Sequence, residues 1–92
     1  MESKIRYGGK EYGEGDELSV YFHLDARRGT YVARSDEGIV IVPERGCRMV
    51  PEMLLGRWLI VDALVRIVKI HVKEDGRKTV IARPLEWRGI YK

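Results

Sequence analysis

A strictly alternating segment, ELSVYFHLD from Glu17 to Asp25, is the feature that most restricts how this chain can fold. Successive side chains of a β-strand point to opposite faces, so alternating apolar and polar residues predict a strand with one buried face. The face expected to be buried carries Leu18, Val20, Phe22 and Leu24. One such strand needs other strands to cover it, and a mainly β fold follows.

Turn chemistry after this segment predicts two more strands, at residues 30–34 and 39–42. Gly29 can take the positive φ that the first turn needs, because it has no Cβ. The sequence Ser-Asp-Glu-Gly forms the second turn, and Pro43 is expected to end the third strand because it cannot donate to a ladder.

The following apolar stretch divides into a helix and a strand. Pro51 suits the first turn of a helix and Gly56 favours a stop, which predicts a short helix at residues 51–55. The β-branched residues that follow predict a long strand within residues 58–73. A single helix over residues 51–65 is the alternative.

Asp75-Gly76 is a strong hairpin signal, and a last strand is expected at residues 78–83. Pro84 should end that strand and leave residues 84–92 as a C-terminal tail. Three tail residues are expected to pack back on the domain: Trp87, Ile90 and Tyr91.

At 92 residues the chain is expected to hold one domain, at residues 17–92. Four glycines within residues 1–16 predict a flexible arm before it, because glycine costs entropy inside regular structure. Five antiparallel strands of this size avoid exposed edges best by closing into a barrel. The order of three strands, a short helix and two strands favours an OB-like barrel, with Sm-like or SH3-like barrels as alternatives. The expected interior comprises Leu18, Val20, Phe22, Leu24, Val40, Val42, Val68, Ile70 and Val80.

Several short stretches follow one another in the order seen in a known family of small barrels. They are Gly15-Asp16, GTYVAR at 29–34, EGIVIVP at 37–43, and Gly46. Residues 15–46 thereby resemble the TRAM domain, an OB-like module found on RNA-modifying enzymes and as stand-alone archaeal proteins. The resemblance implies a TRAM-like barrel that binds RNA. Tyr31 departs from the family, which usually has a second glycine there.

The formal net charge is +3, and the basic residues are concentrated after the first strand. Residues 1–25 hold three basic and six acidic side chains, a balance of −3, whereas residues 26–92 hold fourteen and eight, a balance of +6. A basic excess of this kind indicates an anionic partner, nucleic acid first, although solubility alone explains it equally well.

Aromatic and basic side chains occur together along the predicted strands. Tyr21 and His23 share the outward face of the first strand, and Tyr31 follows the Arg27-Arg28 turn. Unpaired bases stack on such aromatics at ~1–3 kcal/mol each, while Lys and Arg neutralise phosphates. In the alternative interpretation Tyr31 belongs to the core and the arginines protect strand edges. The predicted site for RNA or single-stranded nucleic acid comprises Tyr21, His23, Arg27, Arg28, Tyr31, Arg34, Lys69, His71, Lys73, Arg77 and Lys78.

The apolar segment at residues 49–61 supports a second class of function. Met53, Leu54 and Trp58 are of the types enriched at protein interfaces, which suggests an adaptor or a homodimer.

Catalysis has little support in the sequence. His23, His71 and Cys47 are the only imidazoles and thiol, and they form no cluster with metal-ligand spacing. We therefore expect a non-enzyme without metal or cofactor. The lone cysteine, the lack of an apolar run of ~20 residues and the lack of an apolar signal-peptide centre predict a cytoplasmic protein outside the membrane.

The chain contains neither Asn nor Gln, while charged residues make up 34% of it. This composition is typical of heat-adapted proteins, which avoid thermolabile amides. We expect the domain to stay folded above the mesophile range of ~45–65 °C. Circular dichroism during heating measures this, and a reversible midpoint inside that range would contradict the thermophilic interpretation.

Overall fold

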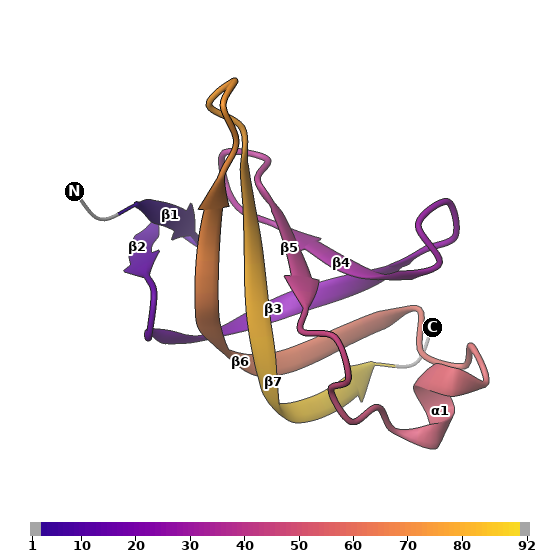
Figure 1. Cartoon of the computed structure of the whole chain (residues 1–92). Coiled ribbons are helices and arrows are strands. Elements are labelled where there is room, and N and C mark those ends of the chain that lie inside the picture. Colours follow the sequence, from indigo (N-terminus) through magenta and orange to yellow (C-terminus); the bar gives the residue numbers. More distant parts are fainter. Residues whose placement is uncertain (1–2, 91–92) are drawn as a thin grey trace.

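The structure, a computed structural model, describes residues 3–90 of the chain, the side chain of Ile90 excepted. It consists of a closed five-stranded β-barrel, a two-stranded sheet and one short helix within the described residues (Figure 1). The barrel strands are β3 (Glu17–Asp25), β4 (Thr30–Arg34), β5 (Val40–Pro43), β6 (Ile60–Val72) and β7 (Lys78–Ile90). The mainly β prediction is thus confirmed.

The strands follow one another around the barrel in the order β3-β4-β5-β7-β6, and β6 pairs with β3 to close it. Neighbouring strands are antiparallel except for β5 and β7, which run parallel. The expectation of a wholly antiparallel barrel was therefore wrong. The reason is geometric: strand directions cannot alternate all the way around a closed ring that has an odd number of strands.

The connection from β5 to β6 contains α1 (Pro51–Leu54), which has Pro51 in its first turn. Gly56 follows with a φ of 71°, a left-handed conformation that ends the helical path. The predicted short helix and the long strand after it are confirmed, and the alternative of one helix over residues 51–65 is excluded.

Strand β7 continues beyond Pro84, which had been expected to end it, so residues 84–90 belong to the barrel and form no separate tail. Pro84 pairs with Val65 where the register between β6 and β7 shifts, and an irregularity of this kind tolerates a residue without an N–H. Trp87 packs against the core as expected, with its ring centroid 5.6 Å from that of Phe22. The expectations for the Ile90 side chain and for Tyr91 lie outside the described residues.

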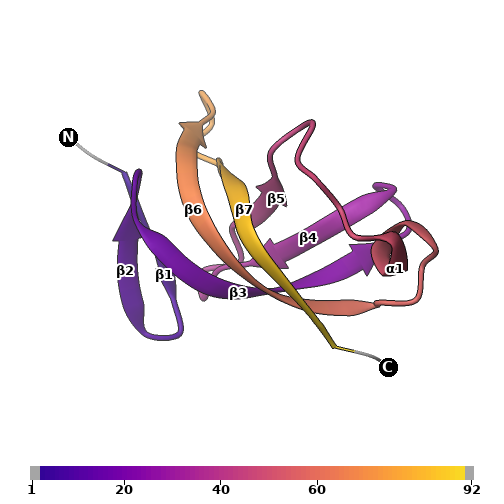
Figure 2. The ribbon, with the colours of Figure 1, turned by 90° about the horizontal axis from the view of Figure 1, so that it is seen from below.

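The glycine-rich N-terminus is a β-hairpin, which corrects the prediction of an arm without regular structure. Strand β1 (Lys4–Tyr7) pairs with β2 (Lys10–Gly13). The turn between them has positive φ at both central residues, 60° at Gly8 and 82° at Gly9, as a type I′ turn requires. Ile5 is buried in the core cluster, so the hairpin packs on the barrel. Figure 2 shows the hairpin and α1 at opposite ends of the molecule.

The core contains most of the expected interior. Leu18, Val20, Phe22, Ile70 and Val80 are buried as predicted. The exceptions are Leu24 and Val68, which are exposed, and Val40 and Val42, which are only half-buried.

Each exception has a local cause. Strand β5 has the opposite phase to the one predicted, so Ile41 points inward. Val68 falls at the register shift between Ile67 and Lys69, where alternation is interrupted. Leu24 lies near the end of β3, where it becomes 39% exposed.

Replacing Phe22 tests this core. Phe22→Ala should lower the free energy of unfolding by ~3–5 kcal/mol, because it leaves a cavity beside Trp87. The control is Leu24→Ala on the same strand, which should cost less than ~1 kcal/mol because Leu24 is exposed. Chemical denaturation measures both, and equal losses would contradict the inward orientation of Phe22.

Candidate nucleic-acid interface

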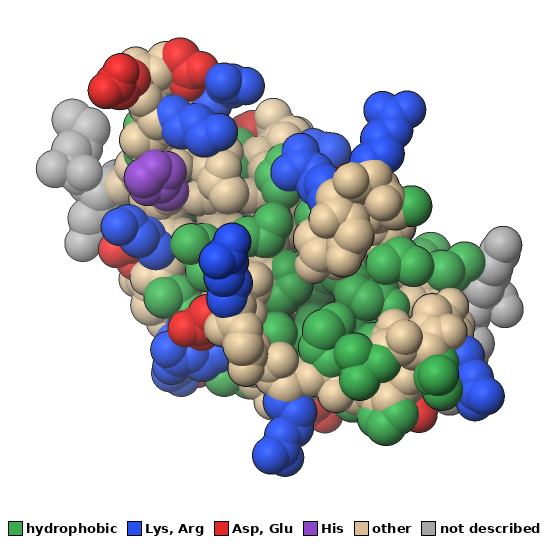
Figure 3. All heavy atoms as spheres, turned by 45° about the vertical axis from the view of Figure 1, so that its right-hand side comes forward, with side chains coloured by type: hydrophobic (Ala, Val, Ile, Leu, Met, Phe, Trp, Pro, Cys, Tyr) green, Lys and Arg blue, Asp and Glu red, His purple; other side chains and the backbone are tan. Residues whose placement is uncertain are grey.

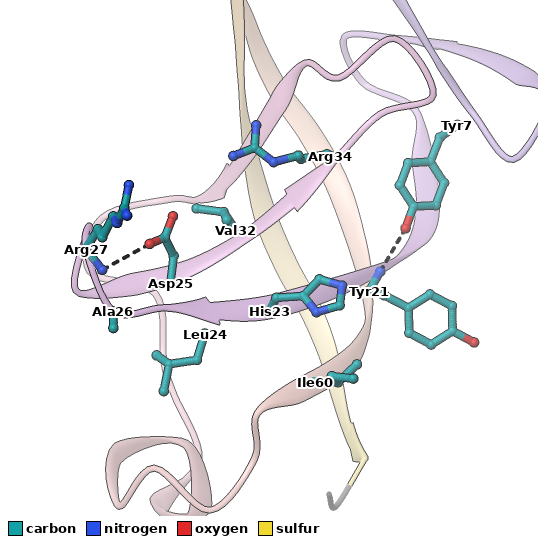
Figure 4. A pocket seen from close by; sticks show the side chains of 10 residues that line it. All are labelled: Tyr7, Tyr21, His23, Leu24, Asp25, Ala26, Arg27, Val32, Arg34 and Ile60. Carbon is teal, nitrogen blue, oxygen red and sulfur yellow. Dashed lines mark hydrogen bonds between the residues drawn. The ribbon is translucent and has the colours of Figure 1, made fainter.

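An open pocket with a volume of ≈ 890 Å³ lies over β3 and β4 on the outside of the barrel (Figure 4). We call it the β3–β4 pocket. It is lined by Tyr7, Tyr21, His23, Leu24, Asp25, Ala26, Arg27, Val32, Arg34 and Ile60. Tyr21, His23, Arg27 and Arg34 were predicted site residues, and the structure brings these together from two strands and the turn between them.

The hollow exists because β3 and β4 pair over a short distance. Their ladder covers only the residues from His23 to Asp25 on β3, and the strands separate beyond it. Val32 lies opposite His23 and forms the floor. It is 5% exposed yet is not part of the core cluster, because alternation turns it outward while Tyr31 and Ala33 point inward.

The walls of the pocket are aromatic. Tyr21 is 51% exposed on the outward face of β3, and His23 follows two residues later on the same face. Tyr7 comes from β1, and its hydroxyl oxygen accepts a hydrogen bond of 2.9 Å from the backbone N–H of Tyr21. Figure 4 shows the imidazole and both phenol rings on the same side of the pocket. Flat side chains arranged in this way can stack on planar ligands.

Positive charge is placed at the opposite side. The salt bridges formed among residues 3–90 include neither Arg27 nor Arg34. The Asp25 carboxylate makes its contacts within the β3–β4 turn. It accepts hydrogen bonds from the backbone N–H groups of Arg27 at 3.0 Å and Arg28 at 3.3 Å, and it forms a salt bridge with the Arg28 guanidinium at 3.3 Å. The turn is therefore fixed while the Arg27 and Arg34 guanidinium groups remain available to an anion.

Arg28 lies on another surface, a hollow of ≈ 440 Å³ between the β4–β5 and β6–β7 turns. We call it the turn cleft. It collects four predicted site residues, namely Arg28, Lys73, Arg77 and Lys78. Arg77 is paired with Asp75 at 2.6 Å, and hydrogen bonds from the Arg77 backbone and side chain lower the pKa of that carboxyl.

Two other predicted residues are not brought into either hollow. Lys69 and His71 are both exposed on β6. His71 lines a further hollow of ≈ 590 Å³ with Lys73 at the tip of the β6–β7 hairpin. The predicted surface residues are thus divided among the β3–β4 pocket, the turn cleft and the exposed end of β6.

Tyr31 is not a surface residue, and the prediction that it stacks on a base is corrected. Its side chain is buried in the core cluster, and its hydroxyl donates to the carbonyl oxygen of Trp58 at 2.6 Å. Burial raises the pKa of this phenol. The alternative interpretation, in which Tyr31 belongs to the core, describes the structure.

The residues suggested for a protein partner are divided as well. Met53 and Trp58 belong to the core, and the Trp58 ring lies so close to Gly89 that a Cβ there would come within 2.0 Å of it. Leu54 is 70% exposed, and the neighbouring Leu55, which belongs to the same predicted apolar segment, is similarly exposed.

Tyr7 and Val32 line the candidate site, and neither was predicted from the sequence. The Gly8-Gly9 pair is a recognised type I′ turn sequence and could have revealed the strand that carries Tyr7. Val32 could have been found by alternation once Tyr31 was assigned to the interior.

The remaining chemical inventory is small. Residues 3–90 contain no group of three His, Cys, Asp or Glu side chains able to hold a metal ion. Burial is the main cause that raises the pKa of the Cys47 thiol, which reduces its thiolate fraction.

Within the same residues the longest helix is α1, far too short to cross a bilayer. Comparison with known protein families, curated proteins and solved structures found no match for this chain.

Proposed function

We propose that this protein is a non-catalytic nucleic-acid-binding module that holds an unpaired strand, RNA in the first place, in the β3–β4 pocket. The observation that carries the proposal is the pocket's composition. Exposed Tyr21 and His23 stand beside an apolar floor, with Arg27 and Arg34 outside every salt bridge of the described chain. Aromatic faces stack on bases of any sequence at ~1–3 kcal/mol each, and nearby guanidinium groups neutralise phosphates.

The turn cleft extends this basic surface. Arg27 and Arg28 are consecutive in the β3–β4 turn, but the first lines the pocket and the second lines the cleft. A strand bound in the pocket would therefore reach Lys73 and Lys78 by passing over this turn. Binding through such a basic groove is expected to depend strongly on salt.

The strand order supports an OB-like, TRAM-like assignment within this proposal. Strands β6-β3-β4-β5 lie in the Greek-key order, with the fourth strand of the barrel beside the first. Adding β7 gives five strands in a Greek-key barrel, the description of an OB-fold, with α1 between the third and fourth strands. OB-folds bind oligonucleotides with their second and third strands and the loops between strands one and two and between four and five. Arg28 lies in the first of these loops here, and Lys73 and Arg77 lie in the second.

Replacing the two pocket arginines tests the proposal. Each phosphate contact to a single strand contributes about 0.7 to the slope of log K against log salt, so Arg27→Ala with Arg34→Ala should flatten the slope by about 1.4. Tyr21→Ala should instead weaken binding by ~1–3 kcal/mol and leave the slope unchanged. Fluorescence anisotropy with labelled single-stranded RNA, single-stranded DNA and duplex at several salt concentrations measures both effects.

The matched control for the arginine pair is Arg83→Ala with Arg88→Ala. Both of these arginines lie on β7 and are paired with carboxylates, Arg83 with Glu44 and Arg88 with Glu86. Removing them lowers the net charge by the same amount as removing Arg27 and Arg34. The proposal therefore requires this control to change the slope of log K against log salt less than the Arg27/Arg34 variant does. Equal slopes for the parent and the Arg27/Arg34 variant would argue against the pocket as the binding surface.

A second candidate function is self-association or adaptor binding through α1. Figure 3, which brings the α1 side forward, shows hydrophobic side chains gathered on this face. Leu54 in α1 and Leu55 directly after it are the most exposed large hydrophobic residues among those described. If this is the function, light scattering should find a dimer whose mass does not change with salt. Leu54→Ser with Leu55→Ser should return a monomer, and a monomeric parent at all concentrations would count against homodimerisation.

A further inference from the structure

We infer that the β1–β2 hairpin is a wall of the nucleic-acid site, with Tyr7 contacting the ligand and Asp36 positioning Tyr7. The inference rests on the proposed function and adds to it two residues from outside the predicted site. Neither residue carries positive charge, and they lie on different elements: Tyr7 on β1 and Asp36 in the β4–β5 turn.

The carboxylate of Asp36 holds the tip of the hairpin. Its two oxygens accept hydrogen bonds from the backbone N–H groups of Gly8 at 3.0 Å and Gly9 at 2.8 Å. Both glycines have positive φ, a conformation that side chains disfavour, and a charged acceptor makes such hydrogen bonds stronger than neutral ones. The turn that carries Asp36 therefore fixes the residues that directly follow Tyr7.

Two further bonds connect the same elements. The backbone N–H of Asp36 donates to the carbonyl oxygen of Arg6 at 2.8 Å, and the Arg6 N–H donates to Glu37 Oε1 at 2.8 Å. Strand β1 is thereby attached to the β4–β5 turn on both sides of Tyr7. The ring of Tyr7 is half-buried against the core, so its position in the pocket is set before any ligand arrives.

The Tyr7 hydroxyl occupies a gap in the barrel ladder. Tyr21 has no β4 partner, because the β3–β4 ladder begins at His23, and its N–H donates to the Tyr7 hydroxyl instead. A phenol has one donor and two acceptor positions, so accepting this bond leaves its own proton free to donate. Among residues 3–90 no hydrogen bond uses that proton. A base stacked on Tyr21 or His23 can supply the acceptor from its edge.

A double-mutant cycle tests the inference with a labelled oligouridine twelve-mer as the probe. Tyr7→Leu should weaken binding about 5- to 150-fold through the loss of a stacking and donor group. Asp36→Ala should weaken binding in the same direction, although it removes a negative charge and electrostatics alone would tighten it. Because Asp36 acts through Tyr7, the double variant should bind no more weakly than Tyr7→Leu alone. The slope of log K against log salt should remain that of the parent, since neither residue is expected to contact phosphate.

Two further variants separate positioning from charge and from folding. Glu11→Ala removes the same charge from an exposed position of β2 and should leave affinity unchanged or slightly higher. Asp36→Asn keeps one acceptor oxygen and should lie between the parent and Asp36→Ala. Thermal midpoints for each variant ensure that binding is compared between folded proteins.

The outcomes distinguish the inference from the function on which it rests. A parent that does not bind the oligonucleotide at low salt overturns both. A parent that binds, with Tyr7→Leu and Asp36→Ala equal to it or tighter, overturns the role of the hairpin and leaves the barrel site intact. Independent, additive losses from the two substitutions would overturn the positioning role of Asp36.

Discussion

Closure of a ring of five strands is the constraint on which the rest of this structure depends. An odd number of strands forces one parallel pair, and that pair is β5 with β7. The next strand in the chain, β6, is not a neighbour of β5 in the barrel, so the chain leaves β5, passes through α1 and returns as β6 beside β3. This connection also supplies Met53 and Trp58 to the core. The strand order thus requires a long connection at this point, and α1 lies within it.

Local sequence patterns predicted where the strands lie better than they predicted which residues of each strand face the barrel interior. The alternation of β3 is unambiguous, so its buried residues and the outward position of Tyr21 and His23 could be read directly. In β5, by contrast, Val40, Ile41 and Val42 are all apolar, and no periodicity indicates which one faces inward. The register shift beside Pro84 depends on the pairing with β6, a property of the assembled sheet that one strand's residues do not encode.

The candidate site was predicted in part for similar reasons. Arg27 and Arg28 are adjacent in sequence, but only the fold shows that they line different hollows. Tyr31 has the opposite orientation to the one predicted: its aromatic side chain is buried, and the neighbouring Val32, for which no role was predicted, forms the floor of the outer pocket. An aromatic residue on a strand is therefore a site candidate only after its phase is known. Tyr7 enters the site from a segment whose glycines favoured an arm, since its docking depends on contacts with a distant turn.

The pairing of β3 with β6 also has a consequence for the order of folding. The longest ladder is the β6–β7 hairpin, whose strands are joined by a short turn at residues 73–77. The ladder between β3 and β6 joins segments about forty residues apart in the chain, and the parallel pair of β5 and β7 is similarly distant. Non-local pairs pay loop-closure entropy before they gain contacts, so they form slowly. The C-terminal hairpin is thus the natural nucleus, and the outer pocket takes shape only when the N-terminal half folds onto it.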